Sequence, residues 1–214
     1  MPRASFDSVP LRWIALTGAG FAVGVGAAIP LGEPIEKLLP DAFSATVIGM
    51  MVITVTSMCV AGGVLGASQW LGLRGALARP SRWIPLSAFG LGFGISVGTS
   101  IVEHVGELLA GHPVRFLKLD VPAQLAALVV VGAVTGVFLG TAQALLLDGS
   151  AARNRWITRS LLATVCAFPI SLLVTETAFG RLNSLLAFGV FLALTGALIG
   201  AVTGAPVQRR APAS

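Results

Sequence analysis

The stretch of sequence that decides the fold runs from Gly62 to Ile84 and reads GGVLGASQWLGLRGALARPSRWI. It begins inside an apolar run with a Gly-x-x-x-Gly-x-x-Gln motif, and it ends on Arg82-Trp83-Ile84, which opens the next apolar run. Only a short basic segment separates the two runs. Such a stretch is typical of two membrane helices joined by a tight connection on one side of the bilayer.

Both motifs of this stretch recur along the chain. Arg-Trp-Ile occurs three times, each time with a glutamate 21 residues after the arginine, and the glycine motif also occurs three times, with Thr in place of Gln in the third copy. The positions are Arg12-Trp13-Ile14 with Glu33, Arg82-Trp83-Ile84 with Glu103, and Arg155-Trp156-Ile157 with Glu176, and then Gly62, Gly66 and Gln69, Gly136, Gly140 and Gln143, and Gly196, Gly200 and Thr203. The sequence therefore predicts one membrane domain, residues 1–214, made of three two-helix repeats at about 12–73, 82–147 and 155–207.

The composition agrees with a membrane class. Of 214 residues, 55% are hydrophobic and 11% charged, and the mean hydropathy is +0.89, whereas a soluble domain has roughly a quarter of its residues charged. This composition excludes a disordered chain, a disulfide-stapled secreted domain and a nucleic-acid binder with a water-facing basic surface. We expect lipid as a partner, no nucleic acid and no cofactor.

Six apolar stretches are long enough to cross a bilayer, which needs about 20 residues. They run approximately over residues 13–32, 45–71, 83–102, 123–147, 156–178 and 184–207. Since the runs are continuous and do not alternate with period two, we expect an all-α integral membrane protein of six transmembrane helices. The first stretch has some features of a signal peptide, but it matches an internal helix of the next repeat and is interpreted as the first span.

The basic residues predict the orientation. The termini and the two even-numbered connections hold ten arginines, whereas the other three connections hold four basic residues. By the positive-inside rule both termini are cytoplasmic. Seven of the nine acidic residues then lie on the outer side.

The recurring residues of the inner side have structural interpretations. Arg12, Arg82 and Arg155, with Trp13, Trp83 and Trp156, are expected to be interfacial anchors at headgroup depth, and the alternative is a belt for anionic lipids or a partner. The glycines Gly62, Gly66, Gly136, Gly140, Gly196 and Gly200 are expected to let helices approach closely. Gln69 and Gln143 are expected to form interhelical hydrogen bonds near the cytoplasmic boundary.

Glu33, Glu103 and Glu176 are the candidate functional residues. The spacing of 21 residues corresponds to about 31 Å of helix, so each glutamate is predicted near the outer boundary of the membrane. If they face a common axis, they form a carboxylate ring that attracts cations or carries protons. If they face outward, they are solvated ends of duplicated helices.

The second outer connection contains both histidines of the chain. His104, Glu107 and His112 are a candidate pH-sensing or metal site in this loop, although their spacing matches no established zinc signature. We therefore assign no metal site from the sequence. The chain has no nucleophile elbow, Walker motif or His-Glu-x-x-His motif, and we expect no enzymatic activity.

The stretch from Gly62 to Trp83 resembles a loose group of uncharacterised bacterial multi-pass membrane proteins, whose helices end in Gln-Trp-x-x-Leu-Arg before a short loop and another Trp. The resemblance is partial at 136–156, where Ala144 replaces Trp and Asp148 replaces Arg. The resemblance implies a bacterial membrane protein and no particular activity. Together with the predicted orientation, it implies a location in the cytoplasmic (inner) membrane of a bacterium.

Two functions are therefore predicted. The first is binding or translocation of a small solute, ion or proton, with the three glutamates at the outer mouth. The alternative is a non-transporting scaffold or accessory subunit that packs against other membrane helices, against lipids or against a second copy of the chain.

Overall fold

The computed structural model of the chain describes residues 8–44, 46–73, 80–112, 114–179 and 185–204. Over these ranges it is helical, with no strand, and six helices are long and apolar enough to cross a membrane. They are α1 (Ser8–Ala28), α4 (Val47–Leu73), α5 (Trp83–Ala110), α6 (Val121–Ala144), α7 (Ser150–Phe179) and α8 (Leu185–Gly204). The all-α prediction is confirmed, and the six apolar helices indicate a multi-pass protein in contact with a lipid bilayer.

Short helices join the long ones. The 3-10 turn η1 (Ile29–Leu31) and α2 (Gly32–Lys37) prolong the first span, and α3 (Asp41–Ser44) precedes α4. Two further 3-10 turns, η2 (Pro80–Arg82) and η3 (Phe116–Lys118), precede α5 and α6. Arg3, Arg74, Arg79, Arg181, Arg209 and Arg210, which contributed to the predicted orientation, lie outside the described residues.

Two helices are longer than the hydropathy alone predicts. Helix α5 continues eight residues beyond the expected end at Val102 and stops at Gly111, whose φ of 70° permits the left-handed cap that ends a helix. Helix α7 begins at Ser150, six residues before the expected start at Trp156. In both places polar and charged residues continue the helix past the apolar run, because helix propensity does not require an apolar side chain.

The start of α6 has a conventional cap. The Asp120 carboxylate accepts a hydrogen bond from the backbone N–H of Ala123 at 3.0 Å, and a proline occupies the first turn. An aspartate cap satisfies one of the free N–H groups, and a proline there loses no helical hydrogen bond. This cap fixes where the connection from α5 ends and where α6 begins.

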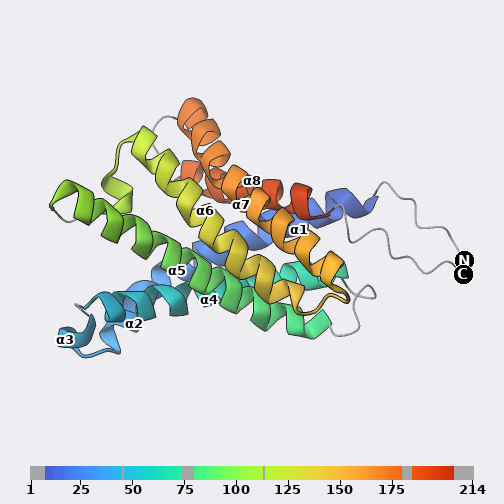
Figure 1. Cartoon of the computed structure of the whole chain (residues 1–214), viewed down its shortest axis with the longest axis horizontal. Coiled ribbons are helices and arrows are strands. Elements are labelled where there is room, and N and C mark those ends of the chain that lie inside the picture. The colour runs from blue at the N-terminus through green and yellow to red at the C-terminus, as the bar shows by residue number, and fades with distance from the viewer. Residues whose placement is uncertain (1–7, 45, 74–79, 113, 180–184, 205–214) are drawn as a thin grey trace, which may run out of the picture.

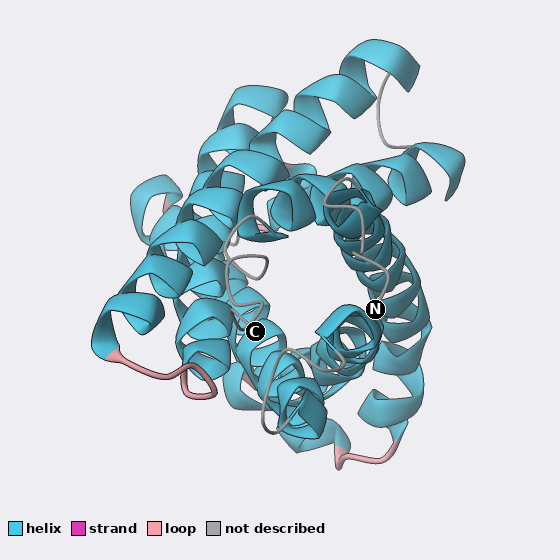
Figure 2. Ribbon diagram, turned by 90° about the vertical axis from the view of Figure 1, so that its right-hand side faces the viewer, coloured by secondary structure: helices cyan, strands magenta, loops and turns pink. Residues whose placement is uncertain are grey.

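The six long helices form a closed ring in chain order. Helix α1 packs on α4, α4 on α5, α5 on α6, α6 on α7, α7 on α8, and α8 returns to α1. Figure 2 shows the ring of helices nearly end on. Each helix is thus placed between two sequence neighbours, with α8 and α1 closing the circle.

Apolar side chains from α1, α4, α5, α6, α7 and α8 fill the middle of the bundle. Leu65, Leu91 and Leu139 are at most 2% exposed. Phe21 of α1 and Phe168 of α7 approach each other with ring centroids 6.1 Å apart, although α8 stands between their helices in the ring order. The interior at this depth is therefore a packed core.

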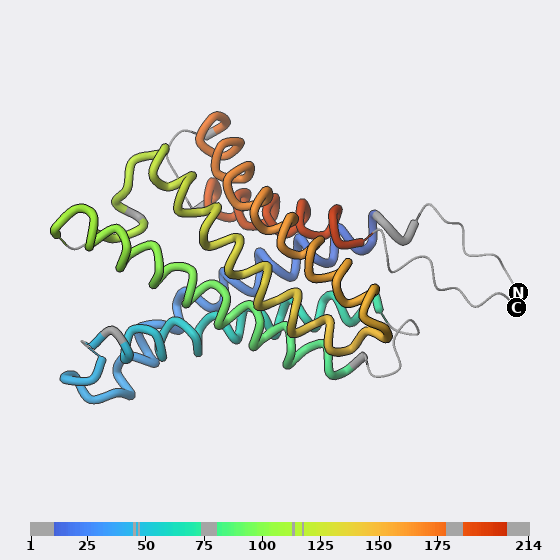
Figure 3. The backbone as a smooth tube through the Cα atoms, viewed as in Figure 1, coloured from blue at the N-terminus to red at the C-terminus, as the bar shows by residue number. Residues whose placement is uncertain are grey.

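The two ends of the bundle differ. We call the end at which α1 begins and α8 ends the inner end, and the opposite end the outer end. The long helices lie close together at the inner end and diverge towards the outer end, where α2 and α3 lie on one side and the last turns of α7 on the other (Figures 1 and 3).

Candidate functional site

Three tryptophan side chains are buried in the bundle near its inner end. Trp13, Trp83 and Trp156 are 4%, 1% and 3% exposed and belong to one buried cluster. The neighbouring arginines of each Arg-Trp-Ile motif are exposed. The helices therefore turn the three indoles into the bundle and leave the motif arginines at the surface, and the expected headgroup depth of both residue types stays a prediction.

Each indole N–H donates to a side chain on the preceding even-numbered helix of the ring. Trp83 Nε1 donates to Gln69 Oε1 at 2.9 Å, and Trp156 Nε1 donates to Gln143 Oε1 at 3.2 Å. The third pair is Trp13 Nε1 and Thr203 Oγ1 at 3.3 Å. The two motifs recognised separately in the sequence thus meet in space, three times, and a buried indole obtains the partner that it requires.

The two glutamines extend these pairs into a network. Gln143 Nε2 donates to Gln69 Oε1 at 3.1 Å and to Ser87 Oγ at 2.8 Å. Trp83 and Trp156 pack edge to face with centroids 5.4 Å apart. We call Trp13, Trp83, Trp156, Gln69, Gln143, Thr203 and Ser87 the inner layer. One set of hydrogen bonds in this layer joins α4, α5, α6 and α7.

Ser87, whose hydroxyl accepts a hydrogen bond from the Gln143 amide, is a residue of the inner layer that was not predicted from the sequence. Ser87 follows Arg82 by five residues, and the same position holds Thr17 in the first repeat and Ser160 in the third. Thr17 Oγ1 and Ser160 Oγ are buried without a hydrogen-bond partner in the described part of the chain. The recurrence of a hydroxyl five residues after each arginine was the signal that would have found this position.

The glycines of the second motif lie where neighbouring helices come closest. An added Cβ at Gly66 would lie 2.9 Å from the Cα of Ile84, at Gly140 it would lie 3.1 Å from that of Ile157, and at Gly200 it would lie 3.0 Å from that of Ile14. The added atoms at Gly62, Gly136 and Gly196 would meet the backbones of the same three partner helices. These separations leave no room for a side chain.

The three glutamates have separate surroundings. Glu33 is exposed and pairs with Lys37 at 2.6 Å within α2. The Glu103 carboxylate accepts a hydrogen bond from the backbone N–H of Phe116 at 3.3 Å and so holds the outer connection, while Glu176 is half-buried on α7. Over the described ranges, no three acidic, His or Cys side chains form a group that could hold a metal ion. That the three carboxylates face a common axis and form a ring at the outer mouth stays a prediction.

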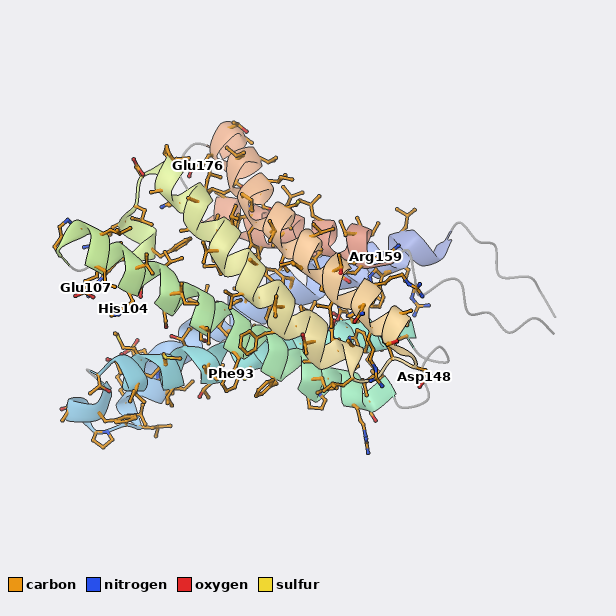
Figure 4. All side chains as sticks on the ribbon, viewed as in Figure 1. Phe93, His104, Glu107, Asp148, Arg159 and Glu176 are labelled. Carbon is orange, nitrogen blue, oxygen red and sulfur yellow. The ribbon has the colours of Figure 1, made fainter. Side chains whose placement is uncertain are left out.

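His104 and Glu107 occupy the last turns of α5, and His112 follows the glycine that ends this helix. All three are exposed. Figure 4 shows His104 and Glu107 on the outer part of α5 and Glu176 on the outer part of α7. These residues are not part of any group that could hold a metal in the described chain, and their role in sensing pH stays a prediction.

Sequence and structure comparisons name no relative for this chain. No family model matches it, and neither a curated protein nor a solved structure is significantly similar to it. Its function is therefore inferred from its own residues.

Proposed function

We propose that this chain is built of three two-helix repeats around a pseudo-three-fold axis, with both termini in the cytoplasm of a bacterium. Equivalent contacts support the repeats: three indole–side-chain hydrogen bonds and three glycine positions opposite the isoleucines of the Arg-Trp-Ile motifs. The distribution of basic residues supports the orientation.

We further propose that the protein is a non-transporting scaffold or accessory subunit of the membrane, which binds lipids and other membrane helices on its outside. The observation that carries this proposal is the filled interior. Apolar side chains occupy the middle of the described bundle, and the inner layer lies across its inner end. Many of the buried hydroxyls along the described spans, such as those of Ser96, Thr175 and Thr195, donate to carbonyls of their own helices. They therefore do not need to line a path for a solute.

A flux measurement tests this proposal. The full chain in proteoliposomes is expected to pass protons and potassium no faster than empty liposomes. The same measurement is made on the double variant Trp83→Ala/Trp156→Ala, which removes the two rings that pack edge to face. A scaffold loses stability in this variant without gaining flux. A transporter closed by these rings would gain flux, and such a gain would contradict the proposal.

The binding role needs its own test. Purification in a mild detergent from native membranes, compared with purification of an unrelated six-span protein, is expected to retain a second membrane chain or a second copy in fixed proportion. Recovery of a lone protomer after cross-linking in intact membranes would contradict it.

A second candidate function is binding of a small solute, ion or proton at the outer end. It is favoured by the divergence of the helices at this end (Figure 1) and by the half-buried positions of Glu103 and Glu176. The test replaces Glu33, Glu103 and Glu176 together with Gln. Loss of a cation or proton flux that the wild type shows would support this function, and an unchanged flux would remove it. That the protein is not an enzyme stays a prediction.

A further inference from the structure

Arg159 is a cation that the inner layer does not use. It lies on α7, ten residues into the helix and one turn beyond Arg155. Figure 4 places it on the half of α7 that belongs to the inner end of the bundle. Its Nη1 atom is buried and has no hydrogen-bond partner in the described chain, whereas the side chain as a whole is only partly buried. One edge of the guanidinium is thus enclosed by protein while another remains open.

Arg159 lies on a face of α7 that packs against a neighbouring helix. Arg159, Ala163 and Ala167 follow one another at intervals of four residues, so they lie on one face of α7. Ala163 and Ala167 are 1% and 0% exposed. The corresponding residues of the first repeat, Leu16, Gly20 and Gly24, lie along α4, the helix that follows α1 in the ring. By this correspondence the face of α7 that carries Arg159 borders α8, which follows α7 in the ring.

The same correspondence identifies Arg159 as a departure from the repeat. The residue four positions after each motif arginine is Leu16 in the first repeat, Leu86 in the second and Arg159 in the third. Leu16 packs against the last turn of α4, with its Cδ1 atom 3.5 Å from the Cβ position of Gly72. The third repeat therefore puts a guanidinium where the first has an apolar contact.

The protein supplies no counter-charge for this guanidinium within its described residues. No carboxylate pairs with Arg159 there, and seven of the nine acidic residues of the sequence belong to the outer side. A guanidinium within a membrane span is costly unless an anion or water reaches it. Since Arg155 lies one turn, or about 5 to 6 Å, closer to the inner surface on the same face, the two arginines can contact one anion together.

We propose that Arg155 and Arg159 bind the phosphate of an anionic lipid headgroup of the inner leaflet, on the side of α7 that borders α8. A phosphate matches the planar fork of a guanidinium and lies at the depth that a partly buried arginine near a helix end can reach. Basic sites between membrane helices on the cytoplasmic side commonly hold such headgroups. The proposal names a lipid partner for the scaffold and rests on its orientation, but its test does not depend on scaffold activity.

The test measures lipid binding to the full chain in nanodiscs and in detergent. Native mass spectrometry would compare retention of phosphatidylglycerol with that of phosphatidylcholine for the wild type, for Arg159→Leu, for Arg159→Lys and for the matched control Arg82→Leu. Leucine at position 159 is the residue that the other two repeats carry, so this variant is expected to fold. The control removes the same charge at the same end, from a motif whose next turn has no cation.

The wild type is expected to prefer phosphatidylglycerol, with the preference reduced about fivefold in Arg159→Leu and less than twofold in Arg82→Leu. Arg159→Lys, which keeps the charge without the fork, is expected to lie between them. Equal losses in Arg159→Leu and Arg82→Leu, or no preference in the wild type, would overturn the proposal. Displacement of the lipid by millimolar inorganic phosphate would assign the site to a soluble phosphate and overturn the lipid as its ligand.

Discussion

Replacing Gln143 with Leu tests the inner layer most sharply. This one amide makes three hydrogen bonds, to Trp156, Ser87 and Gln69, and it is 1% exposed. Leucine has a similar volume, so the packing is retained while the indole N–H of Trp156 and the hydroxyl of Ser87 lose their partner. At about 0.6–1.7 kcal/mol for each interhelical hydrogen bond in a membrane, the loss should be about 2–4 kcal/mol.

The assay is reversible unfolding in mixed micelles, followed by tryptophan fluorescence and circular dichroism. The matched control is Gln124→Leu, on the same helix α6, because Gln124 is only half-buried and lies at the opposite end. The control should change the free energy of unfolding by less than about 0.5 kcal/mol.

A double-mutant cycle separates the contribution of the Trp156–Gln143 hydrogen bond from a non-specific loss of stability. Trp156→Phe removes the indole N–H, and its effect should be smaller in the Gln143→Leu background than in the wild type, with a coupling energy of about 1 kcal/mol. If Gln143→Leu cost no more stability than Gln124→Leu, or if the cycle gave no coupling, the inner layer would not stabilise the bundle and the reasoning would be refuted.

Three further predictions concern packing, the missing amide and the outer charges. Gly140→Ala should destabilise the bundle by about 1–3 kcal/mol, because the added Cβ would lie 2.8 Å from the nearest side-chain carbon. The control Gly189→Ala should not destabilise it, since nothing lies within 4 Å of the added atom there. Equal effects of the two variants would contradict close packing at Gly140. Thr203→Gln should supply an amide to the third repeat and raise the free energy of unfolding by about 1 kcal/mol; a loss of stability would indicate that the third corner has no space for it. Lys37→Ala should leave stability within about 0.5 kcal/mol, since its partner Glu33 is exposed, and a larger loss in the same micelle assay would show that this pair is shielded from water.

The sequence predicted the spans but not the rotation of the helices. Length and hydropathy are sufficient to place α1, α4, α5, α6, α7 and α8, because each must satisfy its own backbone in lipid. Several of these helices are apolar on all sides, so the sequence contains no polar stripe that tells which face meets the interior. For this reason Trp83 could be expected at the lipid surface although it is buried.

Interhelical hydrogen bonds were expected for Gln69 and Gln143, but the tryptophan partners of the inner layer escaped prediction for a second reason. Its pairs combine separate motifs: 14 residues separate Gln69 from Trp83, and 190 separate Trp13 from Thr203. Each motif occurs in all three repeats, but only the closure of α8 onto α1 shows that Trp13, the first of the three tryptophans, meets a Thr rather than a Gln. Whether Glu33, Glu103 and Glu176 face a common axis was the hardest feature to predict. The surroundings of residues at helix ends depend on the connecting loops, and these loops differ among the three repeats.

The most direct test of the central claim is the accessibility of the three tryptophans of the inner layer. The variant Trp70→Phe leaves Trp13, Trp83 and Trp156 as the only tryptophans in the chain. In vesicles, brominated lipids report contact with the bilayer and acrylamide reports contact with water. A buried layer predicts weak quenching of this variant by both reagents. Strong quenching by lipids brominated near the headgroup would instead place the three indoles in contact with lipid at the membrane interface and contradict an inner layer buried in the bundle.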